Sequence, residues 1–196
     1  MNTTNKRKKV VLLGDSIRLL GYGKRAAELL AGDGCEVFQP EENCRYAKYT
    51  QRLLFERWES IRDADVIHFN CGLWDVYDQF RDGETFSTVT EYCDTVERIA
   101  RRLLAVTPHV IFSTTTPVRA AHAHVRTADV ERFNAAVSPR LRALGVTVHD
   151  LFRPVSEHLE RYILSTDNIH LTEEGAEACA ALVAAAVRQE LARTPA

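Results

Sequence analysis

An acid and a histidine stand three residues apart near the C-terminal end of the chain, in "STDNIHLTEEG", residues 165–175. This spacing can place Asp167 and His170 on one turn, where the carboxylate holds one ring nitrogen and the other nitrogen faces outward. The acid then fixes the tautomer of the ring and stabilises the imidazolium that forms when the ring accepts a proton. The pair predicts a general base, although D-x-x-H on its own is common by chance.

A serine that such a base could activate occurs near the other end of the chain, in "VVLLGDSIRLLG", residues 10–21. Ser16 directly follows an apolar run, and Gly14 permits a tight turn. The serine should therefore lie at the carboxyl end of a strand, where backbone N–H groups can converge on a bound group. A Gly-Asp-Ser turn alone is more often a plain helix start. Serine is also a weak nucleophile without a base, so the role of Ser16 depends on the histidine.

A structural role is sufficient to account for each of the other six histidines. They lie in or beside expected strands, in loops or on helix surfaces: His68, His109, His122, His124, His149 and His158. Of these, His68 also has an acid three residues before it, Asp65, but it lies in an expected strand and not on a turn before a helix. We therefore expect His170 to be the base.

Short apolar runs alternate with longer amphipathic stretches, which indicates β and α elements in alternation. The expected strands are 10–13, 36–39, 66–70, 110–114 and 146–150. The expected helices are 22–31, 50–62, 91–106, 127–143 and 172–192. This repetition predicts an α/β fold with a five-stranded parallel sheet, right-handed crossovers and helices on both faces. A chain of this length is expected to form a single domain, residues 1–196.

The chemically interesting stretches follow the expected strands, at the edge where open parallel sheets bind ligands. They are "GDS", "PEENCRYAKYT", "NCGLWD" and "TTTPVRAAHAH". The two longest irregular stretches, 71–90 and 115–126, follow the third and fourth strands, so both should overhang this edge. Long loops over a ligand edge are usually functional.

Composition and charge exclude several classes of function. Apolar residues make up 45% and charged residues 27%, as in ordinary globular proteins. With 25 basic and 27 acidic residues the net charge is −2, which favours neither nucleic acid nor an anionic membrane as partner. The apolar run at 10–13 is too short for a signal peptide, and no stretch approaches a membrane span. We expect a cytoplasmic protein with a small neutral partner; its oligomeric state stays open.

Motifs for metals and cofactors are missing from the sequence. There is no G-x-x-x-x-G-K-[ST], no H-E-x-x-H and no C-x-x-C pair among the five cysteines. The cysteines are odd in number and suit a reducing compartment. We expect neither a metal nor a cofactor.

Together the two motifs resemble those of the SGNH, or GDSL, hydrolases, a family of esterases and lipases with a compact flavodoxin-like fold. "GDSI" matches the first block with Ile for the usual Leu, and "DNIHLTEEG" matches the last block, including the following "LT..G" and helix. The resemblance covers most of the chain. It implies a three-layer sandwich and a carboxylic ester hydrolase with Ser16 as nucleophile, His170 as base and Asp167 as the orienting acid.

The third block of the family departs from its pattern. That block is G-x-N-D, whose Asn helps to hold the oxyanion, whereas "GLWD" matches Gly72 and Asp75 but has Trp74 in place of Asn. Asn70 lies two residues before Gly72, with the same side-chain parity along the strand. We predict that Asn70 supplies the missing donor; a role as a plain strand-end residue stays open.

The second block also departs from the family pattern. Aligning Asn43 and Thr50 to the block puts Lys48 where the family has the glycine whose backbone N–H completes the oxyanion hole. Every residue except proline has this N–H, so the donor survives the exchange. The resemblance therefore implies an oxyanion hole formed by Ser16, Lys48 and, by our prediction, Asn70.

Five side chains near these motifs could contact substrate: Arg18, Tyr22, Arg45, Tyr46 and Trp74. Of these we assign Arg18, Arg45 and Trp74 to substrate binding. The two arginines can bind an anionic group through paired hydrogen bonds, although an arginine is usually a solvated surface charge. Lys48, Arg45 and Trp74 would crowd and polarise the entrance of the pocket. With no long apolar lid in the sequence, this predicts a preference for short acyl chains.

The leading hypothesis is a serine esterase that cleaves short-chain, acetyl-type esters of a small molecule or carbohydrate through an acyl-enzyme. One alternative is a catalytically weak binding module on the same fold. Another is a thioesterase or lysophospholipase-type hydrolase. A flavodoxin-like phosphate binder would use the first turn, but it leaves Asp167 and His170 without a role.

Overall fold

A sheet of five parallel strands forms the centre of the protein in the computed structural model, which describes residues 7–193. The strands are β1 (Lys9–Leu13), β2 (Glu36–Phe38), β3 (Val66–Phe69), β4 (Val110–Ser113) and β5 (Thr147–His149). Their order is β2-β1-β3-β4-β5, and every neighbouring pair is parallel. The predicted fold class is confirmed. The described part of the chain leaves out residues 1–6 and 194–196. Residues 1–6 precede the apolar run, 10–13, that is too short for a signal peptide.

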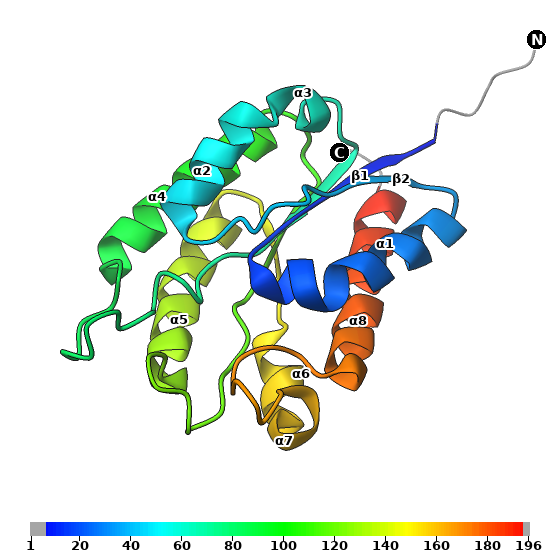
Figure 1. Ribbon diagram of the computed structural model, residues 1–196. Coiled ribbons are helices and arrows are strands. Elements are labelled where there is room, and N and C mark those ends of the chain that lie inside the picture. The colour runs from blue at the N-terminus through cyan, green and yellow to red at the C-terminus, as the bar shows by residue number, and fades with distance from the viewer. Residues whose placement is uncertain (1–6, 194–196) are drawn as a thin grey trace, which may run out of the picture.

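Helices cover both faces of this sheet (Figure 1). One face carries α1 (Gly23–Gly32) and α8 (Glu173–Ala192), and the other carries α2 (Ala47–Glu56), α4 (Val89–Leu104) and α5 (Thr127–Ala143). Strands β1, β3 and β4 are buried almost throughout, as their continuous apolar sequences predict. Among residues 7–193 no helix has the length and apolar character needed to cross a bilayer.

Four short helical segments complete the fold. They are a π-helix, η1 (Ile17–Tyr22), and the helices α3 (Trp58–Ile61), α6 (Phe152–Glu157) and α7 (Leu159–Tyr162). The segment expected as one helix over 50–62 is two helices, because the chain breaks at Arg57. Helix α2 also begins three residues earlier than predicted. Its first N–H, on Ala47, donates to Asp75 Oδ2 at 3.0 Å, so a distant loop stabilises its first turn.

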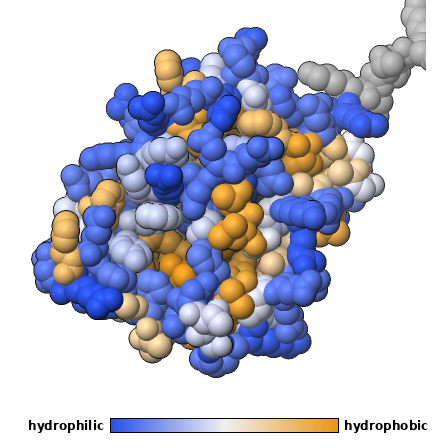
Figure 2. Space-filling model, in the orientation of Figure 1, coloured by the Kyte–Doolittle hydropathy of each residue, from blue (hydrophilic) through white to orange (hydrophobic). Residues whose placement is uncertain are grey.

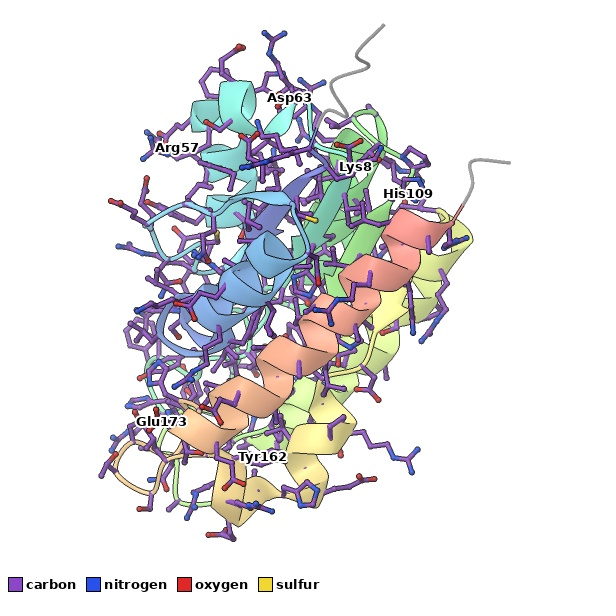
Figure 3. The ribbon with its side chains drawn as sticks, turned by 90° about the vertical axis from the view of Figure 1, so that its right-hand side faces the viewer. Lys8, Arg57, Asp63, His109, Tyr162 and Glu173 are labelled. Atoms are coloured by element: carbon purple, nitrogen blue, oxygen red, sulfur yellow. The ribbon has the colours of Figure 1, made fainter. Side chains whose placement is uncertain are left out.

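The order of the strands reverses between β1 and β3, because β2 lies on one side of β1 and β3 on the other. A crevice for ligands is expected at the carboxyl ends of these two strands. Figure 3 shows the two ends of the molecule: Lys8 and His109 lie at the amino ends of the strands, and Tyr162 and Glu173 lie at the opposite end. The turn that precedes α8 is therefore at the carboxyl end of the sheet.

Hydrogen bonds join the two long irregular stretches at this edge. The Asp78 N–H donates to the His124 carbonyl at 2.7 Å, and His124 Nδ1 lies 2.8 Å from the Asp78 carbonyl oxygen. The Arg126 guanidinium donates to the Gly83 carbonyl at 3.0 Å. The expectation that 71–90 and 115–126 overhang one edge is thus confirmed.

Candidate active site

Ser16 lies on a turn that Asp15 fixes directly after β1. The buried Asp15 Oδ1 accepts hydrogen bonds from the Ile17 N–H at 3.0 Å and from Asn70 Nδ2 at 2.9 Å. The Asp15 carbonyl accepts the Leu19 N–H at 3.0 Å, which closes the first helical turn. With Asp15 directed into the protein, the neighbouring Ser16 remains at the cavity surface with 8% exposure.

The turn before α8 brings Asp167 and His170 together, as the sequence predicts. Asp167 Oδ1 accepts the backbone N–H groups of Ile169 and His170, each at 3.0 Å. Its Oδ2 lies 2.9 Å from His170 Nδ1. Asn168, between them, has a φ of +64°, which Asn tolerates better than most residues. The carboxylate therefore holds Nδ1–H, and Nε2 is left to take up a proton.

The pKa of Asp167 supports this tautomer. Partial burial raises the pKa, but hydrogen bonds from the His170 and Ile169 backbone and from the imidazole outweigh it, and the pKa lies below its usual value. Asp167 is therefore ionised throughout the pH range in which a histidine titrates.

Ser16 and His170 line the same cavity, which has a volume of about 520 Å³. A larger groove of about 790 Å³ lies between α2 and α4, but neither serine nor histidine lines it. The smaller cavity is therefore the candidate active site. Its two chemically important residues come from opposite ends of the sequence, and the parallel sheet brings them together.

Asn70 is placed differently from our prediction. Its Nδ2 donates to Asp15 Oδ1, and its Oδ1 accepts the Tyr22 hydroxyl at 2.7 Å. Asn70 is 3% exposed and is not among the residues that line the cavity. Asp15 accepts a hydrogen bond from the amide that we assigned to the oxyanion. Asn70 instead supports the turn that carries Ser16.

Arg18 is also placed differently, because it is buried with 1% exposure. Its guanidinium donates to the carbonyl oxygens of Pro40 at 2.8 Å, Glu42 at 2.6 Å and Gly14 at 3.3 Å. This arginine joins the loop after β2 to the turn after β1. Contrary to our expectation, it has no surface on which to bind a substrate anion.

The charged groups of Lys48 and Arg45 have contacts outside the cavity lining. The Lys48 ammonium lies 3.9 Å from the Glu91 carboxylate, and the Arg45 guanidinium lies 4.9 Å from the centre of the Tyr49 ring. Neither residue lines the cavity, so their charges do not polarise it as we expected. The backbone N–H of Lys48 belongs to the first turn of α2, where N–H groups have no partner within the helix.

Trp74 does line the cavity and is 41% exposed, as its predicted contact with substrate requires. Its ring stacks on Tyr77, with the ring centres 6.2 Å apart. Tyr46, which the sequence also placed near the site, lines the cavity with Phe86, and their ring centres are 4.9 Å apart. The sequence did not single out Phe86 or Tyr77 for this aromatic wall. On the face shown in Figure 2, apolar side chains form patches among hydrophilic ones.

His122 is a further lining residue that the sequence did not single out. Its only signal is the "HAH" motif in a long stretch after β4. The part of the chain that the structure describes contains no group of three His, Cys, Asp or Glu side chains that could hold a metal ion.

Solved structures of esterases share this architecture. The acetyl xylan esterase AlAXEase is 18% identical, with a TM-score of 0.74 over 91% of this chain and 99% of that chain. A lipase/acylhydrolase from Enterococcus faecalis is 18% identical, with a TM-score of 0.75 over 96% and 100%. Axe2, an acetylxylan esterase from Geobacillus stearothermophilus, is 16% identical, with a TM-score of 0.68 over 95% of each chain.

Comparisons by sequence give a different result, because no protein-family model matches the chain and no significant match to a curated protein is found. At 16–18% identity the structural likeness establishes the fold. The chain therefore has the fold expected from its resemblance to the SGNH, or GDSL, hydrolases.

Proposed function

We propose that this protein is a serine ester hydrolase that cleaves short-chain, acetyl-type esters of a small molecule or carbohydrate. The observation that supports it best is that Ser16 and His170 line one cavity while Asp167 holds His170 Nδ1 at 2.9 Å. Ser16 Oγ attacks the ester carbonyl as His170 Nε2 takes its proton. His170 then protonates the departing alcohol, and water attacks the acyl-enzyme with His170 again as base.

The oxyanion of this reaction needs hydrogen-bond donors, and α2 provides a suitable one. Asp75 accepts the Ala47 N–H, so the next N–H of the first turn, on Lys48, stays available at the positive end of the helix. We assign it, with the Ser16 N–H, to the oxyanion. Trp74, which lines the cavity at the family's Asn position, replaces Asn70 as the proposed side-chain donor.

This assignment predicts different effects for two substitutions. Trp74→Phe keeps an aromatic ring but loses the indole N–H, so kcat should fall by roughly 10²-fold with little change in KM. Asn70→Ala removes a partner of buried Asp15 and should lower the free energy of unfolding by about 1–3 kcal/mol. Steady-state kinetics and urea unfolding of both variants test this. A larger loss of kcat in Asn70→Ala than in Trp74→Phe, with the free energy of unfolding of Asn70→Ala unchanged, would restore Asn70 as the donor.

The cavity also predicts acyl-chain selectivity. A buried methylene contributes about 0.8 kcal/mol, but only where protein covers it. The cavity of about 520 Å³ must hold both the acyl and the alcohol groups of the ester, so a long chain would extend into water. We expect kcat/KM for 4-nitrophenyl esters to stop rising beyond butyryl. A steady increase up to octanoyl would contradict the assignment to short chains.

Hydrolysis of 4-nitrophenyl acetate by the purified protein tests the function itself. An acyl-enzyme whose breakdown limits the rate releases nitrophenol in a burst before steady state, with an amplitude near one per active site. The names of the solved structures support an acetyl ester as the first substrate to use. Binding of an ester without turnover would instead favour the binding module.

The cysteines support the proposed cytoplasmic location. All five are free, and four of them are buried: Cys44, Cys71, Cys93 and Cys179. Free thiols of this kind suit a reducing compartment.

A further inference from the structure

His122 presents a second imidazole to the cavity that Ser16 and His170 line. Two backbone groups fix its ring, because the Val125 N–H at 2.9 Å and the His124 N–H at 3.3 Å both donate to Nδ1. Within residues 7–193 these are the hydrogen bonds that reach this ring, and both end on the same nitrogen.

The bonds to Nδ1 determine the tautomer of His122. A ring nitrogen that accepts a hydrogen bond carries a lone pair, so the proton of the neutral ring is on Nε2. Protonating Nδ1 would break both bonds and leave two backbone N–H groups without a partner. Burial also lowers the pKa of His122, and His124 and His170 act in the same direction, against Asp167. The ring is therefore neutral, with one N–H on Nε2.

His122 lies on the side of the cavity that His170 occupies. Arg119, three residues earlier, donates its N–H to the Asn168 carbonyl at 2.9 Å, which ties this stretch to the Asp167–His170 turn. Two of the proposed oxyanion donors come from other segments, the turn after β1 and the first turn of α2. The third, Trp74, is separated from His122 by Tyr77, whose ring contacts both. In ester cleavage the base protonates the departing alcohol, so the alcohol lies on the histidine side.

Tyr77 supports the ring of His122 at this position. The two rings meet edge to face with centres 6.1 Å apart, and Tyr77 itself stacks on His124 at 4.7 Å. The Nε2–H of His122 is therefore a fixed donor on a packed wall. A fixed donor discriminates strongly, because a ligand without an acceptor leaves it unpaired.

We propose that His122 is a specificity-determining residue whose Nε2–H donates a hydrogen bond to an oxygen in the alcohol part of the substrate. The preferred substrates are then esters of alcohols that carry a second oxygen near the ester bond. This inference rests on the proposed function of the cavity, since it assigns the alcohol side of the same site.

Two esters of matched shape test the inference: 2-methoxyethyl acetate and butyl acetate differ only by an ether oxygen in place of a methylene. The ether oxygen can accept a hydrogen bond but cannot donate one, so it detects a donor on the protein. Wild-type protein should have the higher kcat/KM for 2-methoxyethyl acetate. The readout is the ratio of the two kcat/KM values, measured under identical conditions.

Two substitutions separate the roles of the two ring nitrogens of His122: Nε2–H as the proposed donor to substrate, and Nδ1 as the acceptor of the loop N–H groups. His122→Asn places an amide oxygen near the position of Nδ1, but it is too short to put an N–H at the position of Nε2. The longer side chain of His122→Gln can place an amide N–H near the position of Nε2 but leaves no acceptor at the position of Nδ1. The ratio should fall by roughly 3- to 10-fold in His122→Asn and stay near wild type in His122→Gln. Tm should follow the opposite order, with His122→Gln the less stable.

The control is His158→Asn, which changes an exposed histidine on another part of the molecule and should leave the ratio unchanged. The inference is overturned if His122→Asn keeps the wild-type ratio, or if wild-type protein does not prefer the ether ester. It is also overturned if His122→Asn loses all activity on 4-nitrophenyl acetate, because His122 would then act in the chemistry. If wild-type protein shows no Ser16-dependent hydrolysis of any ester, the proposed function fails and the inference with it.

Discussion

Ser16→Ala should lower kcat for 4-nitrophenyl acetate by roughly 10⁴-fold or more. Alanine has no hydroxyl to form the acyl-enzyme, so only the oxyanion donors and binding remain. The fold should be kept, because Asp15 and not Ser16 makes the hydrogen bonds that fix the turn. Steady-state kinetics together with circular dichroism and Tm test both parts of this prediction.

His170→Ala and the double variant extend this test. Nucleophile and base act as a unit, so the double variant should be hardly slower than Ser16→Ala alone. Ser138→Ala is a matched control, because Ser138 is as little exposed as Ser16 but hydrogen-bonds to Asn134 within α5. Its kcat should stay within about threefold of wild type, since surface or helix substitutions away from a site rarely alter chemistry. If Ser16→Ala kept most of its activity, the nucleophile would be another group.

Asp167→Asn should lower kcat by roughly 10³- to 10⁴-fold and change its dependence on pH. An amide at this position can donate to His170 Nδ1 and stabilise the tautomer that cannot act as base. In the wild type, activity should rise with pH as His170 loses its proton, while Asp167 stays ionised because its pKa is lowered. In Asp167→Asn the residual activity should have its midpoint at lower pH, since the charge that stabilises the imidazolium is gone.

Asp75 needs its own control in this experiment, because burial brings its titration near neutral pH. Burial raises the pKa of Asp75 to about 7, against the hydrogen bonds from Ser87 and from the Ala47 backbone. Asp75→Asn can accept the Ala47 N–H with its oxygen and donate to the Ser87 hydroxyl with its NH2 group, but it cannot ionise. The rise of activity with pH should persist in Asp75→Asn if His170 is its source. A profile that is flat between pH 5 and 8 in the wild type, while chemistry limits the rate, would contradict a histidine base.

The sequence predicted the sheet, the main helices and the turn of Asp167 and His170 because local patterns determine them. Strands β1, β3 and β4 are continuous apolar runs, and α5 begins and ends where its periodicity does. Asp167 and His170 are three residues apart, so their contact forms within one turn. The early start of α2 was missed because its first N–H is bound by Asp75, a residue distant in sequence.

The errors at the site have the same physical origin. Arginine is usually exposed, but three carbonyl oxygens from two loops accept hydrogen bonds from Arg18 inside the protein. Asn70 directly follows β3, as expected, but its amide donates to Asp15. From the sequence, His122 is an ordinary loop or helix-surface histidine. In the structure its loop contacts the turn of Asn168, and His122 lines the cavity. Each outcome depends on contacts between segments that no local pattern contains.

Covalent labelling tests the central claim most directly. A fluorophosphonate reacts with a serine whose hydroxyl an adjacent base activates, and the adduct can be located by mass spectrometry of peptides. We predict one equivalent of label on Ser16, faster labelling as His170 loses its proton, and almost no labelling in His170→Ala. No labelling of folded wild-type protein, or labelling of another residue that leaves Ser16 unmodified, would contradict the assignment of Ser16 as the nucleophile.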